Sequence, residues 1–164
     1  VMVIKLLKEE GCPDWVIEHS LAVCNKAKEI SKNFDVSQEL IEEAALLHDI
    51  GRSKTNDIDH AIIGANLAIE KGFSNEVASI IEKHVGSGIS KKEAIELGLP
   101  EKDYIPSTVE EKIISHADNL IHGIEEVDIE FIVNKWKNYQ INNLEESIDR
   151  LKKVHEELIT RFEK

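Results

Sequence analysis

Apolar residues recur every three or four positions along most of the chain, and the strict alternation of a strand is nowhere sustained. This period is that of an amphipathic helix, so the pattern predicts an all-α fold, a bundle of about seven to nine helices. With their caps and terminal glycines, the expected helices cover residues 1–10, 13–33, 37–51, 59–72, 74–86, 90–98, 107–121, 128–139 and 143–163.

Several helix starts carry their own signals. Ser37, Asp59 and Ser74 are expected N-caps. Ser90-Lys91-Lys92-Glu93 and Ser107-Thr108-Val109-Glu110 have the form of a capping box. No linker, repeat or low-complexity tract is visible, so residues 1–164 are expected to form one domain.

Four polar side chains occupy positions where the helical spacing calls for an apolar one: His19, His48, His84 and Asp118. His19, for example, follows Val16 by three residues and precedes Val23 by four. Burying one such group without a partner costs several kcal/mol, roughly 2–7. A shared cation would supply the partner, and imidazole with carboxylate suits first-row metals. A single core histidine is more often structural, so the prediction rests on the four positions together.

Composition narrows the class of partner. The formal net charge is -12, and no basic face for bulk nucleic acid is visible. No apolar run is long enough to span a bilayer and no secretion signal is apparent, so a cytoplasmic protein without a membrane partner is expected. Cys12 and Cys24 match no metal-binding spacing and are expected to be reduced and structural.

The order His19, His48-Asp49, Asp118 resembles the HD superfamily of metal-dependent phosphohydrolases over roughly residues 13–122. The local contexts that carry this resemblance are Glu18-His19-Ser20-Leu21-Ala22-Val23, Ala44-Ala45-Leu46-Leu47-His48-Asp49-Ile50-Gly51-Arg52 and Ser115-His116-Ala117-Asp118-Asn119-Leu120. The resemblance implies an HD-type helical bundle in which His19, His48, Asp49 and Asp118 bind metal.

Two further histidines refine the resemblance. Asp59-His60 and Lys83-His84 lie between the His-Asp pair and Asp118, a layout similar to the dinuclear diadenosine tetraphosphate hydrolases and, more distantly, to cyclic-di-GMP phosphodiesterases of the HD-GYP type. By that resemblance His60 and His84 would bind a second ion and Asp49 would bridge the two. Asp59-His60 could instead simply cap a helix. The ions expected are two divalent metals, Fe, Mn, Co, Ni or Zn, with Mg as a further option.

Charged residues beside the ligands are candidates for the chemistry. Asp49, Arg52 and Lys54 are the expected catalytic residues, the last two as phosphate contacts. Lys83 is a weaker candidate because a surface charge is at least as common. The backbone N–H groups of 86–88 could also hold a phosphate.

Outside the ligand set, Asn119 and His122 could support Asp118. The segment 99–106 could form a rim over the site. Leu144, Ile148, Leu151, His155, Leu158 and Phe162 form a seam in the last helix. This seam is expected to pack on the parent domain together with Trp136 and Tyr139, which leaves a monomer or a homodimer open. A base-stacking role for the two aromatic residues is the less favoured interpretation.

The hypothesis is therefore a phosphohydrolase that uses metal-activated water on a small phosphorylated substrate of nucleotide type. Three alternatives stay open: a one-metal nucleoside 5′-monophosphatase, a di-iron oxygenase that uses the same six ligands, and a nucleotide sensor without turnover.

Overall fold

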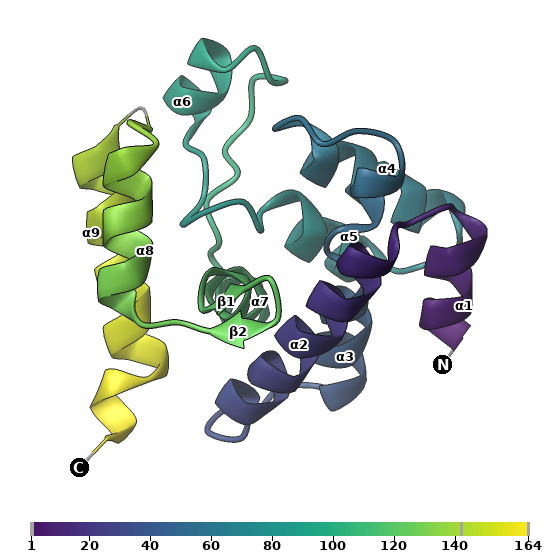
Figure 1. Ribbon diagram of the computed structural model, residues 1–164, viewed down its shortest axis with the longest axis horizontal. Coiled ribbons are helices and arrows are strands. Elements are labelled where there is room, and N and C mark those ends of the chain that lie inside the picture. The colour runs from purple at the N-terminus through teal and green to yellow at the C-terminus, as the bar shows by residue number, and fades with distance from the viewer. Residues whose placement is uncertain (1, 142, 164) are drawn as a thin grey trace.

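The computed structural model describes residues 2–141 and 143–163. Within these residues the fold is all-α, as predicted, with one minimal hairpin (Figure 1). The elements are α1 (Met2–Glu9), α2 (Asp14–Ser31), α3 (Gln38–Leu47), a 3-10 turn (Ile50–Ser53), α4 (His60–Glu70), α5 (Asn75–Glu82), α6 (Lys91–Glu96), α7 (Val109–Asn119), β1 (Ile121–His122), β2 (Glu125–Glu126), α8 (Ile129–Asn138), α9 (Leu144–Leu158) and a 3-10 turn (Thr160–Phe162).

Helix starts follow the capping signals with two exceptions. The hydroxyls of Ser37, Ser74 and Ser90 accept the expected backbone N–H bonds, and Ser90 closes a capping box with Glu93. The box of α7 lies one residue later than predicted, on Thr108 and Glu111, because Glu111 reaches the backbone N–H groups of residues 107 and 108. Asp59 occupies the N-cap position of α4 without a side-chain capping bond.

Several helix ends were predicted too late. The helix expected to carry His84 as far as residue 86 ends at Glu82, so His84 lies just beyond it. The helix that contains His48 was expected to run to Gly51, but α3 ends at Leu47 and a 3-10 turn follows. The helix that contains Asp118 was expected to reach Ile121, but α7 ends at Asn119, and Ile121–His122 pairs with Glu125–Glu126 around Gly123, whose φ is 66°. The last helix ends at Leu158 and gives way to a 3-10 turn.

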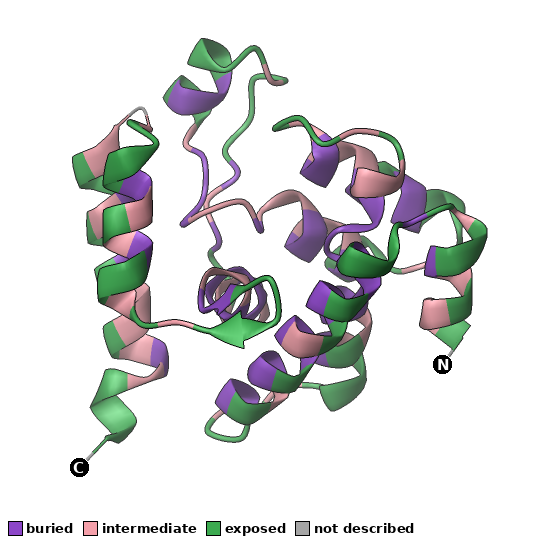
Figure 2. Ribbon diagram, viewed as in Figure 1, coloured by how far each residue is buried: buried purple, intermediate pink, exposed green. Residues whose placement is uncertain are grey.

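Helix α7 runs through the middle of the molecule, with α2 and α3 on one side and the α8–α9 pair on the other (Figure 1). Its apolar residues, with those of α2, α3, α8 and α9, form the larger core cluster. A second cluster joins α1 and the start of α2 to α4 and α5. Buried positions accordingly follow the inward faces of the helices (Figure 2). The metal ligands predicted from the sequence come from helices of both clusters, most of them from helix ends.

The C-terminal pair is fastened to the rest by polar contacts as well as by the predicted seam, of which Leu151 and Leu158 are buried. The ring nitrogens of His116 and His155 lie 2.8 Å apart, and Lys112 Nζ lies 3.0 Å from Glu157 Oε2. These contacts join α7 to α9. Helix α9 is therefore a packed part of the fold, and the side of α8 that faces the ligand-bearing helices is held in place.

Two smaller findings concern the surface and the cysteines. Cys12 and Cys24 are both buried and free, as expected. Over residues 2–141 and 143–163, no helix has the combination of length and hydropathy that crossing a bilayer requires.

Candidate metal centre

Six polar side chains converge from five parts of the chain. His19 lies in α2, Asp118 lies in α7, and His60 is the first residue of α4. His48 and Asp49 lie between α3 and the 3-10 turn, and His84 follows the end of α5. All are buried except Asp118, which is partly exposed because it lines a cavity. Every metal ligand predicted from the sequence is therefore present at one place.

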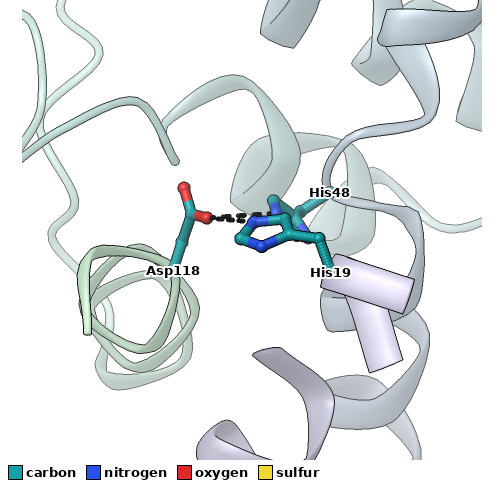
Figure 3. A group of neighbouring side chains, drawn as sticks. All are labelled: His19, His48 and Asp118. Atoms are coloured by element: carbon teal, nitrogen blue, oxygen red, sulfur yellow. Dashed lines mark hydrogen bonds and ion pairs between the residues drawn. The ribbon is translucent and has the colours of Figure 1, made fainter. Parts of the chain in front are cut away.

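One group of ligands gathers around Asp118. Figure 3 shows its carboxylate facing the imidazole rings of His19 and His48. Asp118 Oδ1 lies 2.8 Å from His19 Nε2 and 3.4 Å from His48 Nε2. Asp49 Oδ2 completes the group, at 3.8 Å from His19 Nε2 and 3.5 Å from His48 Nε2.

A second group gathers around the other oxygen of Asp49. Asp49 Oδ1 lies 3.3 Å from His60 Nε2 and 3.3 Å from His84 Nε2, and these two nitrogens are 3.2 Å apart. Ligand atoms bound about 2.1 Å from one ion lie about 3.0–3.4 Å from each other. Most separations in both groups fall within or close to that interval, and the two oxygens of Asp49 face different groups.

Backbone carbonyls determine which nitrogen each imidazole turns toward the centre. The Nδ1 atoms of His19, His48, His60 and His84 lie 2.6–2.9 Å from the carbonyl oxygens of Gly123, Ala45, Asp57 and Ile81. A carbonyl can only accept, so each Nδ1 donates, and the neutral ring turns an Nε2 lone pair inward. The centre therefore collects six groups that all offer lone pairs.

Such a collection of acceptors requires added positive charge, and two observations indicate that the demand for positive charge is strong. His48 Nε2 and Asp49 Oδ1 are buried without a hydrogen-bond partner. Burial by itself would lower the pKa of His48, but the charges of Asp49 and Asp118 outweigh it and raise that pKa to about 9. A divalent cation fits the same atoms better than a proton, because one ion can satisfy several lone pairs at once.

The carboxylates experience the same electrostatics in reverse. Burial would raise the pKa of Asp49, but His48 and the contacts with His60 and His84 hold it well below its usual range. Burial would likewise raise the pKa of Asp118, but His48 and His19 keep that pKa below its usual range. Both carboxylates are therefore ionised and ready to bind a cation.

Gly51 allows the turn that follows Asp49 to approach the start of α4 closely. A Cβ at Gly51 would collide with the carbonyl oxygen of His60 and would lie 2.8 Å from Gly64 N. The 3-10 turn after Asp49 therefore packs directly on the backbone of α4. This close approach places the first residue of α4, His60, against Asp49.

A cavity of about 300 Å³ opens onto the ligands. Of the predicted phosphate contacts, Arg52 lines it, with its Nε 3.3 Å from Asp49 Oδ1 and its guanidinium over the ring of Trp15. Lys54 is exposed and lies outside the residues that line this cavity. Lys83 instead pairs with the buried carboxylate of Glu111 at 3.2 Å, so it has a structural contact.

Two other residues of the cavity wall, Lys135 of α8 and Trp15 of α2, escaped the sequence interpretation. Trp136 of α8, for which the sequence favoured a packing role, lines the cavity as well. No local signal distinguishes Lys135 from any other lysine on a helix surface, because only the packing of α8 turns it toward the ligands. The segment 99–106, predicted as a rim, supplies no lining residue and packs instead through Tyr104 against Ile89.

Two predicted supporting residues have different contacts from those expected. His122 lines the cavity and packs on the ring of Phe131, with ring centroids 5.1 Å apart, rather than bonding to Asp118. The amide of Asn119 donates to the carbonyl oxygen of Gly86 at 2.9 Å, and Ser115 Oγ donates to the same oxygen at 2.8 Å. Asn119 therefore fixes the loop after His84.

Comparison with known proteins gives a family match and several relatives. Residues 16–122 match the HD domain family. The chain is 45% identical over 152 residues to an uncharacterized protein of Methanocaldococcus jannaschii, with 90% of this chain and 89% of that protein covered. It is 42% identical over 155 residues to the tRNA (cytidine(56)-2'-O)-methyltransferase of Picrophilus torridus, which covers 94% of this chain and 45% of that enzyme. The chain thus spans less than half the length of this methyltransferase.

A more distant relative and one solved structure complete the comparison. Ribonuclease Y of Protochlamydia amoebophila is 29% identical over 143 residues, which cover 86% of this chain and 22% of that enzyme. The HD domain of the Listeria monocytogenes phosphodiesterase PgpH superposes with a TM-score of 0.57 at 17% identity, covering 97% of this chain and 96% of that one. At this identity the superposition establishes a shared fold.

Proposed function

The chain belongs to the HD domain family, and on that premise we propose that it is a metal-dependent phosphohydrolase that acts on a small nucleotide-type phosphodiester, phosphoanhydride or phosphomonoester. The observation that carries the proposal is the convergence of four inward Nε2 atoms and two ionised carboxylates, all acceptors. Cations are the partners that such a set requires, and a cavity beside them gives a substrate access.

The proposal includes two ions for each chain, as in the dinuclear diadenosine tetraphosphate hydrolase type. Asp49 supports this number, because its Oδ2 faces His19 and His48 while its Oδ1 faces His60 and His84. A carboxylate in this position can bridge. Two divalent ions, when bound, activate water for attack and neutralise charge on the phosphoryl oxygens.

The chain's own residues would orient the substrate. Arg52 places a guanidinium at the cavity wall, where a planar cation can bind two phosphate oxygens. Lys135 of α8 adds a second cation to the wall of the same cavity, from a different element than the 3-10 turn that carries Arg52. Each Nδ1–H bond to a carbonyl stops its imidazole from rotating, so the ligand atoms stay aimed at the centre while the substrate enters and leaves.

RNA is the competing substrate class, because the names of the methyltransferase and ribonuclease relatives refer to RNA. Charge argues against it for this chain. Protein affinity for polynucleotides comes largely from cations that neutralise phosphates, and the net charge here is -12. A cavity of about 300 Å³ is at the small end of ligand-sized pockets. A small phosphorylated molecule therefore fits better than a bulk nucleic acid.

The direct test is hydrolysis of bis(p-nitrophenyl) phosphate and diadenosine tetraphosphate by the purified chain with Mn²⁺, Co²⁺ or Ni²⁺. Asp49→Ala should reduce the rate to background, since it removes the ligand shared by both groups. Asp35→Ala, which removes an exposed carboxylate outside the cavity, is the matched control and should leave the rate unchanged. Full activity in the Asp49→Ala protein would contradict a metal-dependent mechanism that requires Asp49.

The same preparation separates the alternatives. One ion per chain with release of phosphate from nucleoside 5′-monophosphates would favour the one-metal monophosphatase. Oxygen consumption with a bound substrate that carries no phosphate would favour a di-iron oxygenase. Tight nucleotide binding with no turnover on any phosphorylated compound would favour a sensor.

A further inference from the structure

A second cavity, of about 450 Å³, lies directly beside the metal cavity. Its walls come from the segment 85–89, from α6, from the C-terminal half of α8 and from the start of α9. Val85, Gly86, Lys135 and Trp136 line both cavities, so the two are contiguous. Trp136 is the side chain at their junction, and its ring would lie 3.9 Å from a Cβ placed on Gly86.

The wall of this second cavity is mainly apolar, and part of it is unexpectedly exposed. Ile58, Leu97 and Tyr139 are 38%, 40% and 69% exposed, and they come from three separate parts of the chain. In a protein with 32% charged residues, exposed apolar side chains that meet at one concave surface indicate a binding site. Ile89 and Ile141 extend the same surface.

The polar groups beneath this wall are already paired with each other. Arg150 of α9 donates to the carbonyl oxygens of Ser87 and Gly88 at 3.3 and 3.0 Å, and pairs with the buried Glu93 at 3.1 Å. Ser87 Oγ donates to the carbonyl oxygen of Ser147 at 2.8 Å. The floor is therefore fixed, and what it leaves for a ligand is an apolar surface with aromatic side chains.

One cation lies where the two cavities meet. Lys135 lines both, and among residues 2–141 and 143–163 its ammonium group forms no ion pair. A phosphate that extends from the metal cavity toward the apolar one would pass this lysine. The metal ligands, Lys135 and the apolar aromatic wall follow one another along the two cavities. In a nucleotide the terminal phosphate, the inner phosphate or sugar, and the base follow one another in the same order.

We propose that the second cavity binds the base of the substrate, against Trp136 and Tyr139, while Lys135 contacts the phosphate chain that leads to the metal cavity. The inference rests on the proposed function, which it narrows to nucleoside phosphates whose base contributes to binding. Base–aromatic contacts bind any base, because every base has a π-face. The site would therefore select nucleotides over phosphate compounds without a ring, with little choice among bases.

The test is calorimetric binding of two probes to the Mn²⁺-loaded protein: adenosine 5′-(α,β-imido)diphosphate and imidodiphosphate. Both carry the same non-hydrolysable P–N–P group, and only the first has a base. The nucleotide should bind about 5- to 150-fold more tightly, the range that one base–aromatic contact contributes. Equal affinities, or no binding of either probe, would overturn the proposal.

Filling the cavity provides the matched variants. Leu97→Trp should bring the affinity of the nucleotide down to that of imidodiphosphate and leave imidodiphosphate unchanged. Ile95→Trp is the control, since Ile95 lies in α6 two residues before Leu97, is 55% exposed and does not line the cavity. Ile58→Trp fills the cavity from a different segment, so agreement between the two filling variants excludes local misfolding of α6. Retention of the nucleotide's advantage in both variants would contradict the assignment.

Lys135 and hydrolysis give separate readouts. Lys135→Ala should weaken both probes and Lys135→Arg should restore them, because the contact is with phosphate; a variant that weakens neither would contradict that contact. Hydrolysis of bis(p-nitrophenyl) phosphate by the unaltered protein tests the proposed function on its own. Hydrolysis with no advantage for the nucleotide would refute the base site alone, whereas a cavity-dependent advantage without any hydrolysis would refute the hydrolase and leave the base site standing.

Discussion

At the residue scale, the metal centre depends on which nitrogen each imidazole turns inward. In His48, His60 and His84 the Nδ1 atom meets the carbonyl oxygen three residues earlier in the chain. A short local bond thus holds the ring without the help of a long-range contact. Each of these side chains needs only its own helix end to be correctly built, and tertiary packing then brings the Nε2 atoms together.

Replacing one histidine of the second group should separate the two proposed ions. His60→Gln removes a ligand beside Asp49 Oδ1 and leaves His19, His48 and Asp118 in place. We expect metal content to fall from about two ions per chain to about one, and kcat to fall by about 10- to 100-fold or more. Elemental analysis with steady-state kinetics measures both.

His122→Gln is the matched control for that experiment, because His122 lines the same cavity and packs on Phe131 instead of joining the ligand groups. It should keep the metal content of the unaltered protein. Two tightly bound ions in the His60→Gln protein would show that His60 acts as a helix start rather than as a ligand.

The candidate ligands could be picked out from the sequence, and the cavity beside them could not. His19 and Asp118 each interrupt an apolar helical face, which is visible in the spacing of neighbouring residues. Arg52 was found because it follows the His-Asp pair closely. Lys135 carries no such local signal, since its position beside the ligands results from how α8 packs, 87 residues after His48 in a chain of 164 residues.

At the element scale, the capping box of α7 was misplaced by one residue because two adjacent residues of the right type were available at each of its two positions. Both Ser107 and Thr108 can cap α7, and either Glu110 or Glu111 can provide the carboxylate of the capping box. Glu111 forms the box because its carboxylate is buried and also accepts hydrogen bonds from Ser79 Oγ at 2.7 Å and from Lys83 Nζ at 3.2 Å. Those partners come from α5 and its end, so tertiary contacts decided a choice that the capping pattern left open.

This network makes Glu111 a stabilising residue with a defined pH dependence. Burial would raise its pKa, but bonds from Ser107, Ser79, Thr108 and Lys83 outweigh burial and lower it from 4.5 to about 2. Its contribution to stability is therefore present above pH 4.5 and is lost as the pH falls toward 2.

Glu111→Gln should accordingly lower the free energy of unfolding at pH 7 by about 1–3 kcal/mol, the usual cost of losing hydrogen bonds to a buried charged group. The difference from the unaltered protein should shrink below pH 4.5, because Glu111 then takes up a proton in the unfolded chain while it stays ionised in the folded one until the pH nears its folded pKa of about 2. Urea unfolding between pH 7 and pH 3 measures it. Glu110→Gln, which removes the same charge from the same turn, should show no comparable loss, and a pH-independent difference for Glu111→Gln would contradict the pKa argument.

The contact between the 3-10 turn and α4 gives a second prediction at this scale. Gly51→Ala places a methyl group against the carbonyl oxygen of His60, so the turn and the helix must move apart. We expect a loss of about 1–3 kcal/mol of stability from overpacking. We also expect weaker binding of the ion that Asp49 and His60 are proposed to share.

Thermal unfolding and Mn²⁺ titration test the two effects of Gly51→Ala separately. Ser53→Ala, in the same turn but without added volume at the contact, is the control and should change metal affinity little. Unchanged Mn²⁺ affinity in the Gly51→Ala protein would mean that the close approach serves packing and is not needed for the metal centre.

At the scale of the whole molecule, the ligands connect elements that otherwise belong to different parts of the core. His19 and Asp118 come from the helices of the larger cluster, whereas His60 and His84 come from α4 and the end of α5, which pack in the smaller one. Ions bound to both groups would join the two clusters through Asp49. Metal binding should therefore stabilise the fold as a whole and not only the site.

Removing metal should thus lower the melting temperature of the chain. A ligand that binds only the folded state at 100 times its Kd adds about 2.7 kcal/mol, and for a domain of this size each kcal/mol corresponds to about 2–4 °C. We expect a fall of about 5–11 °C after chelation, reversed by added Mn²⁺. Asp49→Ala, which loses the residue common to both groups, should melt at the same temperature with and without chelator, whereas Asp35→Ala should respond like the unaltered protein. Equal melting temperatures of the unaltered protein before and after chelation would show that the convergent acceptors do not couple the two clusters through metal.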